Sequence, residues 1–425
     1  MIKRTLHLLL FACVSGAGAM GQINCATGSA DATKLVCQIP FSTGVFSTIG
    51  SSSSSAEVQK NATAINSSIA TQVSQLPVAS SSSGVVVIYR AGVPETYSNL
   101  GPILTDRSQT IGRHKLFLGF SASQFVFTDV DGIPLKNVPF TYEATSYAQD
   151  GKTVLSQSYI SGSSNISFKI NQYIAIGTFG LTDKIDFSMI LPIERVSIGA
   201  ETYNTQGYLL NADNVLVIGP YSIPPTYVPG TASGIGDITF IGKDELWRGE
   251  HTTFAAGMNL RTPTGDALNY LGSGAWGFNP FLVVSYLWKV SPHAKIGYQW
   301  NTSTILNNNT ALPGGLQYDA GADWAMLKSV TVAGDLLGSQ YLNAPRLVAG
   351  TTPLPVPLTN PPTPTTVNLP TVTTSNSGYT INDFSAGLKW RPFRGLVLSG
   401  NVLFQLNNNG MRSRPTPLVG ISYKF

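Results

Sequence analysis

The last eight residues of the chain, Leu418 to Phe425, alternate between two kinds of side chain. Val419, Ile421, Tyr423 and Phe425 occupy one parity, and small or polar residues occupy most of the other. A period of two places the two sets on opposite faces of a β-strand. In a soluble sandwich the apolar face contacts a core, whereas in a transmembrane barrel it contacts lipid and the polar face lines the lumen. The stretch predicts a strand of one of these two classes.

The composition favours the barrel. Charged residues make up 11% of the chain, against roughly 25% in a soluble globular protein. No stretch after the N-terminus carries ~18 consecutive apolar residues, so no transmembrane helix is expected. The ending resembles the C-terminal strand of bacterial outer-membrane barrels. That resemblance implies that the barrel-assembly machinery reads Tyr423 and Phe425 as an assembly signal.

The N-terminus predicts export. Lys3 and Arg4 precede an apolar run over residues 6–14 and an A-x-A cleavage site, which is typical of a secretory signal peptide over residues 1–19. A lipoprotein signal ending at Cys13 is the alternative. The formal charge of +4 falls to +2 when Lys3 and Arg4 are removed. A balance so close to neutral predicts no nucleic-acid partner.

Two cysteines, Cys25 and Cys37, remain after the predicted cleavage. An oxidising compartment favours a disulfide between them. A metal site is the alternative, but Asp31 is the one neighbouring residue that could serve as a further ligand. No metal and no cofactor is therefore predicted.

Residues 20–112 do not alternate. Apolar residues recur at three- and four-residue spacing from Val58 through Ile65 and Ile69 to Leu76, which predicts a helix over about 56–76. We interpret the segment either as a periplasmic helix with linkers or as a plug folded into the barrel mouth. In the second case the apolar stripe would offer hydrophobic ligands a surface in a polar lumen.

Residues 113–425 predict an all-β fold, a transmembrane antiparallel β-barrel of about twelve strands, with fourteen as the alternative. The expected strands are 115–128, 166–181, 184–200, 234–246, 251–262, 277–290, 293–305, 316–327, 329–342, 380–391, 395–406 and 412–425. The connections between them alternate between short turns and long loops, as periplasmic turns and extracellular loops do in such barrels. The long ones are 129–165, 201–233, 263–276, 306–315 and 343–379.

Two stretches interrupt this pattern. Pro192 lies within a predicted strand, and the register slips between Glu194 and Val196, so a bulge is expected there. The Pro/Thr-rich stretch 351–370 is expected to be extended or disordered.

No catalytic site is predicted, and the chain is not expected to be an enzyme. His114, His251 and His293 are the histidines that remain after the signal, and none has a Ser or Asp neighbour in a motif. Pairs such as Gly234 and Gly236 precede a strand rather than a helix, so they do not indicate a phosphate site.

The strand face opposite the apolar one carries charges of both signs. Opposite charges pairing across a water-filled interior and an ion-selective constriction are the two interpretations, and the mixed signs favour the first. The lumen-facing candidates are Asp237, Arg261, Lys295, Asp319, Asp323, Asp335, Lys389, Arg412 and Arg414.

Residues 233–298 carry specific sequence motifs in addition to the alternation of strands. Residues 233–237 open a strand, the next upward strand ends in Arg261-Thr262-Pro263-Thr264-Gly265-Asp266, and a loop 271–277 leads towards Gly297-Tyr298. In order and spacing this resembles the outer-membrane family named for the meta-pathway of phenol degradation. Stretches 104–112 and 179–186 also fit, so the resemblance covers roughly residues 100 to 425. The motif residues expected to build the loop are Pro263, Gly265, Asp266, Gly272, Gly274 and Trp276.

The resemblance implies an outer-membrane channel or transporter for small hydrophobic or aromatic compounds, in a cell of the Gram-negative type. Its expected partners are outer-membrane lipid, the assembly machinery and a small ligand. A general diffusion porin is the close alternative, and a structural or adhesive barrel is the alternative of a different class.

Overall fold

The structure is a computed structural model that describes residues 23, 30–31, 33–38, 56–77, 80, 86–90, 93–97, 99–147, 153–213, 215–357 and 364–425. The predicted signal peptide and Cys25 lie outside the described residues. Cys37 is buried and disulfide-bonded, and its pairing with Cys25 stays a prediction. Within the described ranges no helix has the length and apolarity that crossing a membrane requires.

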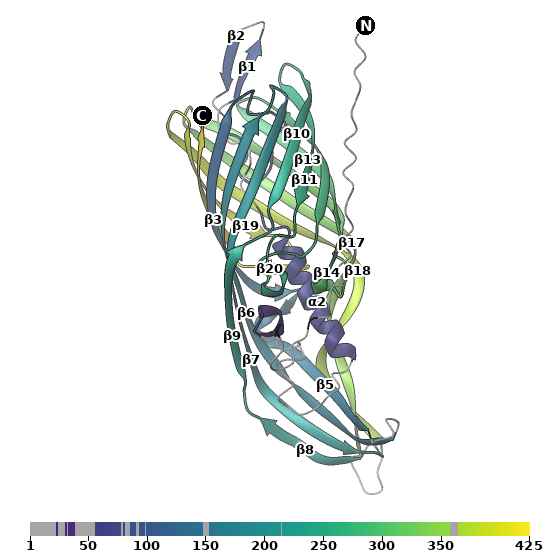
Figure 1. The fold of residues 1–425 in the computed structure, drawn as a ribbon. Coiled ribbons are helices and arrows are strands. Elements are labelled where there is room, and N and C mark those ends of the chain that lie inside the picture. The colour runs from purple at the N-terminus through teal and green to yellow at the C-terminus, as the bar shows by residue number, and fades with distance from the viewer. Residues whose placement is uncertain are drawn as a thin grey trace, which may run out of the picture.

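Twelve antiparallel strands close into a barrel (Figure 1). The last of them, β21, pairs with the first, β3, so the barrel has no open edge. The predicted count of twelve is confirmed and the alternative of fourteen is wrong. In chain order the barrel strands are β3 (Leu116–Val130), β6 (Val154–Gly180), β7 (Ile185–Asn211), β10 (Thr239–Arg248), β11 (Thr252–Arg261), β12 (Gly277–Tyr286), β13 (Val290–Asn301), β16 (Gly315–Leu327), β17 (Val330–Pro357), β18 (Pro364–Phe393), β19 (Leu396–Gln405) and β21 (Thr416–Lys424).

Four strands run far beyond the others. β6 and β7 have 27 residues each, β17 has 28 and β18 has 30, although about 9–11 residues suffice to cross lipid. Their extensions form an outer sheet with β5 (Val138–Tyr147), β8 (Leu216–Ile223) and β9 (Tyr227–Ile235) (Figure 1). The expectation that 129–165, 201–233 and 343–379 are loops is therefore wrong in most of its length. We call this end of the barrel the outer end and the end with the short turns the inner end.

The outside of the barrel is apolar. Side chains that alternate outward, such as Phe120, Leu282 and Ile296, are about half exposed, and tryptophans lie near the strand ends, for example Trp288 and Trp300. An exposed apolar surface that encircles the molecule marks contact with lipid rather than water. The protein is an outer-membrane β-barrel.

The chain end lies on this lipid-type surface. The Phe425 side chain is 60% exposed, its backbone N–H donates to the Leu116 carbonyl at 2.8 Å, and its ring stacks edge-on against Tyr423 with centroids 4.6 Å apart.

We expect Phe425→Asp to impair membrane insertion, because a charge replaces the aromatic anchor on the lipid-facing strand. The fraction of protein with the faster mobility of an unboiled, folded barrel should fall clearly in gels. Phe425→Tyr is the matched control, since it keeps the ring. Equal folded fractions for Phe425→Asp and the wild type would contradict the proposed assembly signal.

The strand β7 shows no slip at Pro192. Its pairing with β6 runs without a register shift from Tyr203 to Asp186, so the predicted bulge between Glu194 and Val196 is wrong. The neighbouring chain changes instead: β10 pairs with β7 up to Ile190 and β9 pairs from Ile193, on either side of Pro192. Val196 points inward because the lumen at that depth is filled by an apolar cluster rather than water.

The N-terminal part of the chain lies partly inside the barrel and partly beyond its inner end. The helix α2 (Ala56–Val73) sits where the barrel meets the outer sheet, and the hairpin of β1 (Val86–Arg90) and β2 (Val93–Tyr97) lies beyond the inner end (Figure 1). Ser80 donates its backbone N–H to the Ile103 carbonyl at 2.8 Å. The described parts of residues 56–112 thus extend from the outer half of the lumen to the inner end and return into the lumen.

Candidate functional site

The inner end of the lumen is filled by residues 99–112, which we call the inner plug. This stretch has no regular secondary structure, so its buried backbone groups need partners from elsewhere. Barrel side chains supply them: Lys243 donates through Nζ to the carbonyls of Arg107 and Gln109 at 3.0 Å each. Asp186 accepts the backbone N–H of Ile111 at 2.8 Å. The wall thus fixes the course of the plug.

Glycines with positive φ stand near both ends of the inner plug. Gly101 has φ +79° and Gly112 has φ +94°, a region that favours glycine. A Cβ at Gly101 would lie 3.1 Å from the Arg107 guanidinium, so the chain folds closely on itself there. These two turns direct the segment into the lumen and out towards β3.

A buried polar cluster holds the middle of the inner plug. The His293 ring places Nδ1 3.2 Å from Asp323 and Nε2 2.9 Å from Asp335. The Thr105 hydroxyl lies 2.7 Å from His293 Nε2 and donates to Asp335 at 3.1 Å. The sequence predicts no partner for His293, whereas the fold brings two carboxylates to it from β16 and β17.

The same cluster offers no room for a substrate. A hydroxyl, an imidazole and a carboxylate within hydrogen-bond distance are the parts of a nucleophilic site. However, the cavity beside His293 and Asp323 measures about 10 Å³, room for one water at most. The geometry supports a role in holding Thr105.

We expect Lys243→Met to loosen the inner plug. The change keeps the length of the side chain but leaves the carbonyls of Arg107 and Gln109 without their donor, at about 1–3 kcal/mol for each buried group. In planar bilayers the variant should show brief openings that the wild type lacks. Lys328→Met, in the turn between β16 and β17, is the control. If the variant shows no more channel openings than the wild type, Lys243 does not hold the inner plug.

The outer side of the lumen is closed by α2 and the residues that follow it. Ile65 and Ile69 are buried in the main apolar cluster together with wall residues such as Phe125 and Val196. The stripe on the helix is therefore packed against the barrel, and the expectation that it offers a free surface to ligands is wrong for these two residues. Asn66 accepts a hydrogen bond from the Tyr270 hydroxyl at 2.6 Å.

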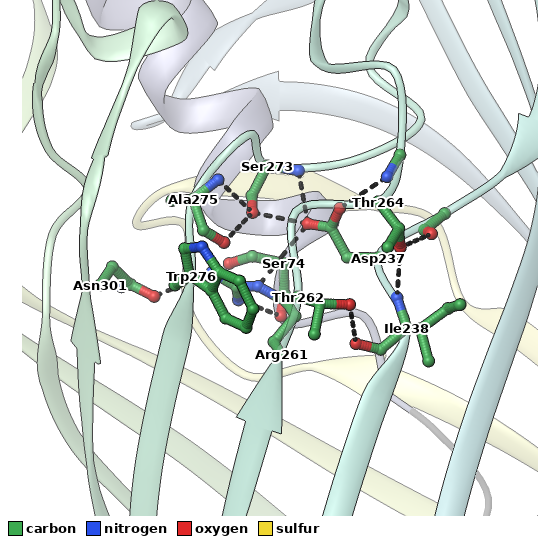
Figure 2. A network of polar contacts seen from close by, with 12 residues as sticks. Ser74, Asp237, Ile238, Arg261, Thr262, Thr264, Ser273, Ala275, Trp276 and Asn301 are labelled. Carbon is green, nitrogen blue, oxygen red and sulfur yellow. Dashed lines mark hydrogen bonds and ion pairs between the residues drawn. The ribbon is translucent and has the colours of Figure 1, made fainter. Parts of the chain in front are cut away.

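Asp237 organises the loop between β11 and β12 (Figure 2). One carboxylate oxygen accepts the N–H of Gly265 at 3.1 Å, and the other accepts the N–H and the hydroxyl of Ser273 at 2.7 and 2.6 Å. Arg261 places Nε 3.6 Å from the same carboxylate and donates to the Ser74 carbonyl at 2.9 Å. One pair of residues thus links the loop to the N-terminal chain.

The glycines of this loop stand where there is no room for a side chain. A Cβ at Gly265 would lie 2.3 Å from the Leu271 carbonyl oxygen, and one at Gly272 would lie 2.3 Å from Asp237 Oδ1. Gly274 adopts φ +66°. In the same loop the backbone N–H of Trp276 donates to the Thr302 hydroxyl at 3.0 Å. Pro263 stands in the tight turn in which the Thr264 N–H donates to the Thr262 carbonyl at 2.9 Å.

Asp266 joins the loop to the outer part of the N-terminal chain. Its carboxylate accepts from Lys34 Nζ at 2.9 Å, just before the 3₁₀ helix η1 (Leu35–Gln38). Burial raises the pKa of Asp266, but the hydrogen bonds from Lys34 and Asn269 outweigh it and lower the pKa below its usual value. The pair is thus favoured with Asp266 ionised.

Between the two closures lies a chamber of about 240 Å³. Its wall combines apolar, amide and charged side chains from the barrel with residues of both N-terminal stretches. Representative lining residues are Gln75, Leu76, Leu104, Phe125, Ile190, Ile241, Asn279, Gln317, Leu337, Tyr341 and Met411.

The predicted lumen residues fall into four groups. Arg261, Lys295, Asp319 and Arg412 line the chamber. Asp237 supports the loop, and Asp323, Asp335 and Lys389 surround the inner plug, where Lys389 contacts the Pro102 carbonyl. Arg414 is exposed at the bend between β20 (Met411–Ser413) and β21, and its placement in the lumen stays a prediction.

Comparison with known proteins agrees with this architecture. Residues 145–340 match the model of the family named for the MetA-pathway of phenol degradation. The predicted family resemblance is confirmed. The family's match includes Asp237, Arg261 and the whole loop that they hold, so these residues lie within the part of the chain that the family model describes.

Solved structures resemble the chain in outline. A crystal structure of an outer-membrane channel from Pseudomonas putida F1 has a TM-score of 0.45 and 15% identity, covering 75% of this chain and 98% of that one. The NanC porin gives a TM-score of 0.35 at 9% identity over 68% and 99%. A FadL homologue of Pseudomonas aeruginosa gives 0.30 at 9% over 74% and 90%. No curated protein matches the chain in sequence.

Proposed function

We propose that the protein mediates uptake of small hydrophobic or aromatic compounds across the outer membrane. The observation that carries the proposal is the chamber of about 240 Å³ that is lined by the inner plug and by residues 74–77 and 80. A cavity of about 150 Å³ holds benzene, so a single substituted ring fits and a disaccharide does not. On this proposal the partners are outer-membrane lipid, the assembly machinery and the small ligand.

The chamber wall suits such a compound. Leu76, Leu104 and Phe125 offer apolar surface, while Asn279 and Gln317 offer amide groups a short distance away. Small-molecule sites commonly combine an apolar lining with a few polar groups that fix orientation. A general porin, the runner-up function, has no use for a lumen whose two ends are filled by its own chain.

Uptake by intact cells tests the proposal. Cells with and without the protein are given labelled toluene, labelled anthracene and a labelled trisaccharide at low external concentration. We expect the protein to raise the initial uptake of toluene about tenfold, equivalent to about 1.4 kcal/mol, and to leave the other two unchanged. Faster uptake of the trisaccharide would favour the porin, and no effect on toluene would overturn the proposal.

A further inference from the structure

The charged groups of the chamber wall are not equivalent. Arg412 pairs with Asp383 at 2.5 Å, and Arg261 is held by Asp237, by the Ser74 carbonyl and by Asn301. Each of these cations thus has a partner in the protein. A ligand would compete with existing contacts to reach them.

Lys295 is also engaged. Its Nζ lies 3.0 Å from Asp106 of the inner plug and 4.6 Å from the centroid of the Phe281 ring. In the sheet register Lys295 stands directly opposite Asp319 on β16. Cross-strand neighbours of opposite charge stabilise a sheet when they pair. Here the Lys295 ammonium group pairs instead with Asp106 of the inner plug.

Asp319 is the charged residue of the chamber wall that has no partner among the described residues. It lines the cavity and is partly exposed to it. Within the part of the chain that the structure describes it makes no hydrogen bond and no ion pair, in contrast to Asp106 and Asp383. A carboxylate that faces a small chamber accepts hydrogen bonds and favours positive charge, and it opposes a second carboxylate.

We propose that Asp319 is the specificity-determining residue of the chamber, which selects single-ring compounds bearing a hydroxyl or amine donor and rejects aromatic carboxylates. The inference rests on the proposed uptake function and adds to it a preference by charge. Asp106 acts as a positioning residue, because it keeps Lys295 away from Asp319.

Equilibrium dialysis of the full chain in lipid nanodiscs at pH 8 tests the preference, with empty nanodiscs subtracted. The probes are benzyl alcohol, benzylamine and benzoate, which share one ring and differ in the group that would meet Asp319. We expect both donors to bind about tenfold more tightly than benzoate, the size of effect that one charge-assisted hydrogen bond supplies. Equal dissociation constants for the three probes would overturn the charge preference and leave uptake standing.

Two variants locate the effect. Asp319→Asn should reduce the ratio of benzoate to benzylamine dissociation constants about tenfold. Asp106→Asn should reduce it in the same direction, because a released Lys295 can pair with Asp319. Asp213→Asn, on the exposed turn between β7 and β8, is the matched control and should keep the wild-type ratio.

The outcomes separate the two proposals. A ratio unchanged in Asp319→Asn, in protein that keeps its heat-modifiable mobility, would overturn the role of Asp319. If the wild-type protein binds none of the three probes, the chamber is not a ligand site and the proposed uptake function fails with it.

Discussion

A chain that lacks residues 23–112 is expected to form an open, steadily conducting pore in planar bilayers, whereas the intact protein conducts ions poorly. The deletion removes the inner plug together with α2 and residues 74–77 and 80, which lie in the lumen on the two sides of the chamber. The barrel itself is closed by the pairing of β21 with β3 and does not depend on these residues for an edge. Single-channel recording measures the difference directly.

A shorter deletion serves as the control. Removing residues 23–98 leaves the inner plug and its contacts with Lys243, Asp186 and Asp335 in place. Conductance should then stay close to that of the intact protein. Large steady conductance of the intact chain would contradict the closure, and equal conductance of the two deletions would show that residues 99–112 do not block the lumen.

Asp237→Ala is expected to have the largest effect of any single substitution on the outer closure. The change removes three hydrogen bonds to Gly265 and Ser273 and leaves the buried Arg261 without its carboxylate. Breaking a buried ion pair by removing one partner costs about 3–5 kcal/mol. The loop 262–276 and the Ser74 contact should therefore loosen while the barrel stays intact.

Hydrogen exchange measures this loosening. The amides of Gly265 and Ser273 should lose protection by about two orders of magnitude or more, since each 1.4 kcal/mol is a factor of ten. Asp213→Ala, on an exposed turn, should leave both amides as protected as in the wild type. Slow exchange of both amides in Asp237→Ala would show that the loop is held by other contacts.

Alternation made the barrel predictable. Strands such as β13 and β19 carry apolar residues outward at every second position, because lipid imposes that choice. The extensions of β17 and β18 beyond the lipid are free of this constraint, so Thr371 and its neighbours resembled a loop. Their pairing from Leu347 opposite Thr374 to Pro357 opposite Pro364 became visible in the fold alone.

The contents of the lumen were harder to predict. Val196 and Ile174 point inward in spite of being apolar, because the N-terminal chain and other inward side chains replace water there. A rule that expects a polar lumen misreads such positions as a change of register. Which segment fills a barrel depends on contacts between residues far apart in the chain, and a single sequence does not show them.

The cluster around His293 combines residues that the sequence makes predictable with one that it does not. The sequence predicts Asp323 and Asp335 in the lumen, and His293 begins the neighbouring predicted strand 293–305. Three titratable residues at one level of consecutive barrel strands are the sequence signal of this cluster. Thr105, the fourth member, comes from the inner plug and had no such signal.

A cross-link tests most directly whether the inner plug occupies the lumen. The hydroxyls of Ser108 in the plug and Thr253 on β11 are hydrogen-bonded and buried, so the double variant Ser108→Cys, Thr253→Cys should form a disulfide in isolated outer membranes. Ser108→Cys with Thr416→Cys, on β21, should not. A shift in mobility on non-reducing gels for the first pair, reversed by reductant, is the predicted result. Two free thiols in a folded barrel of the first pair would contradict the closure of the lumen by its own chain.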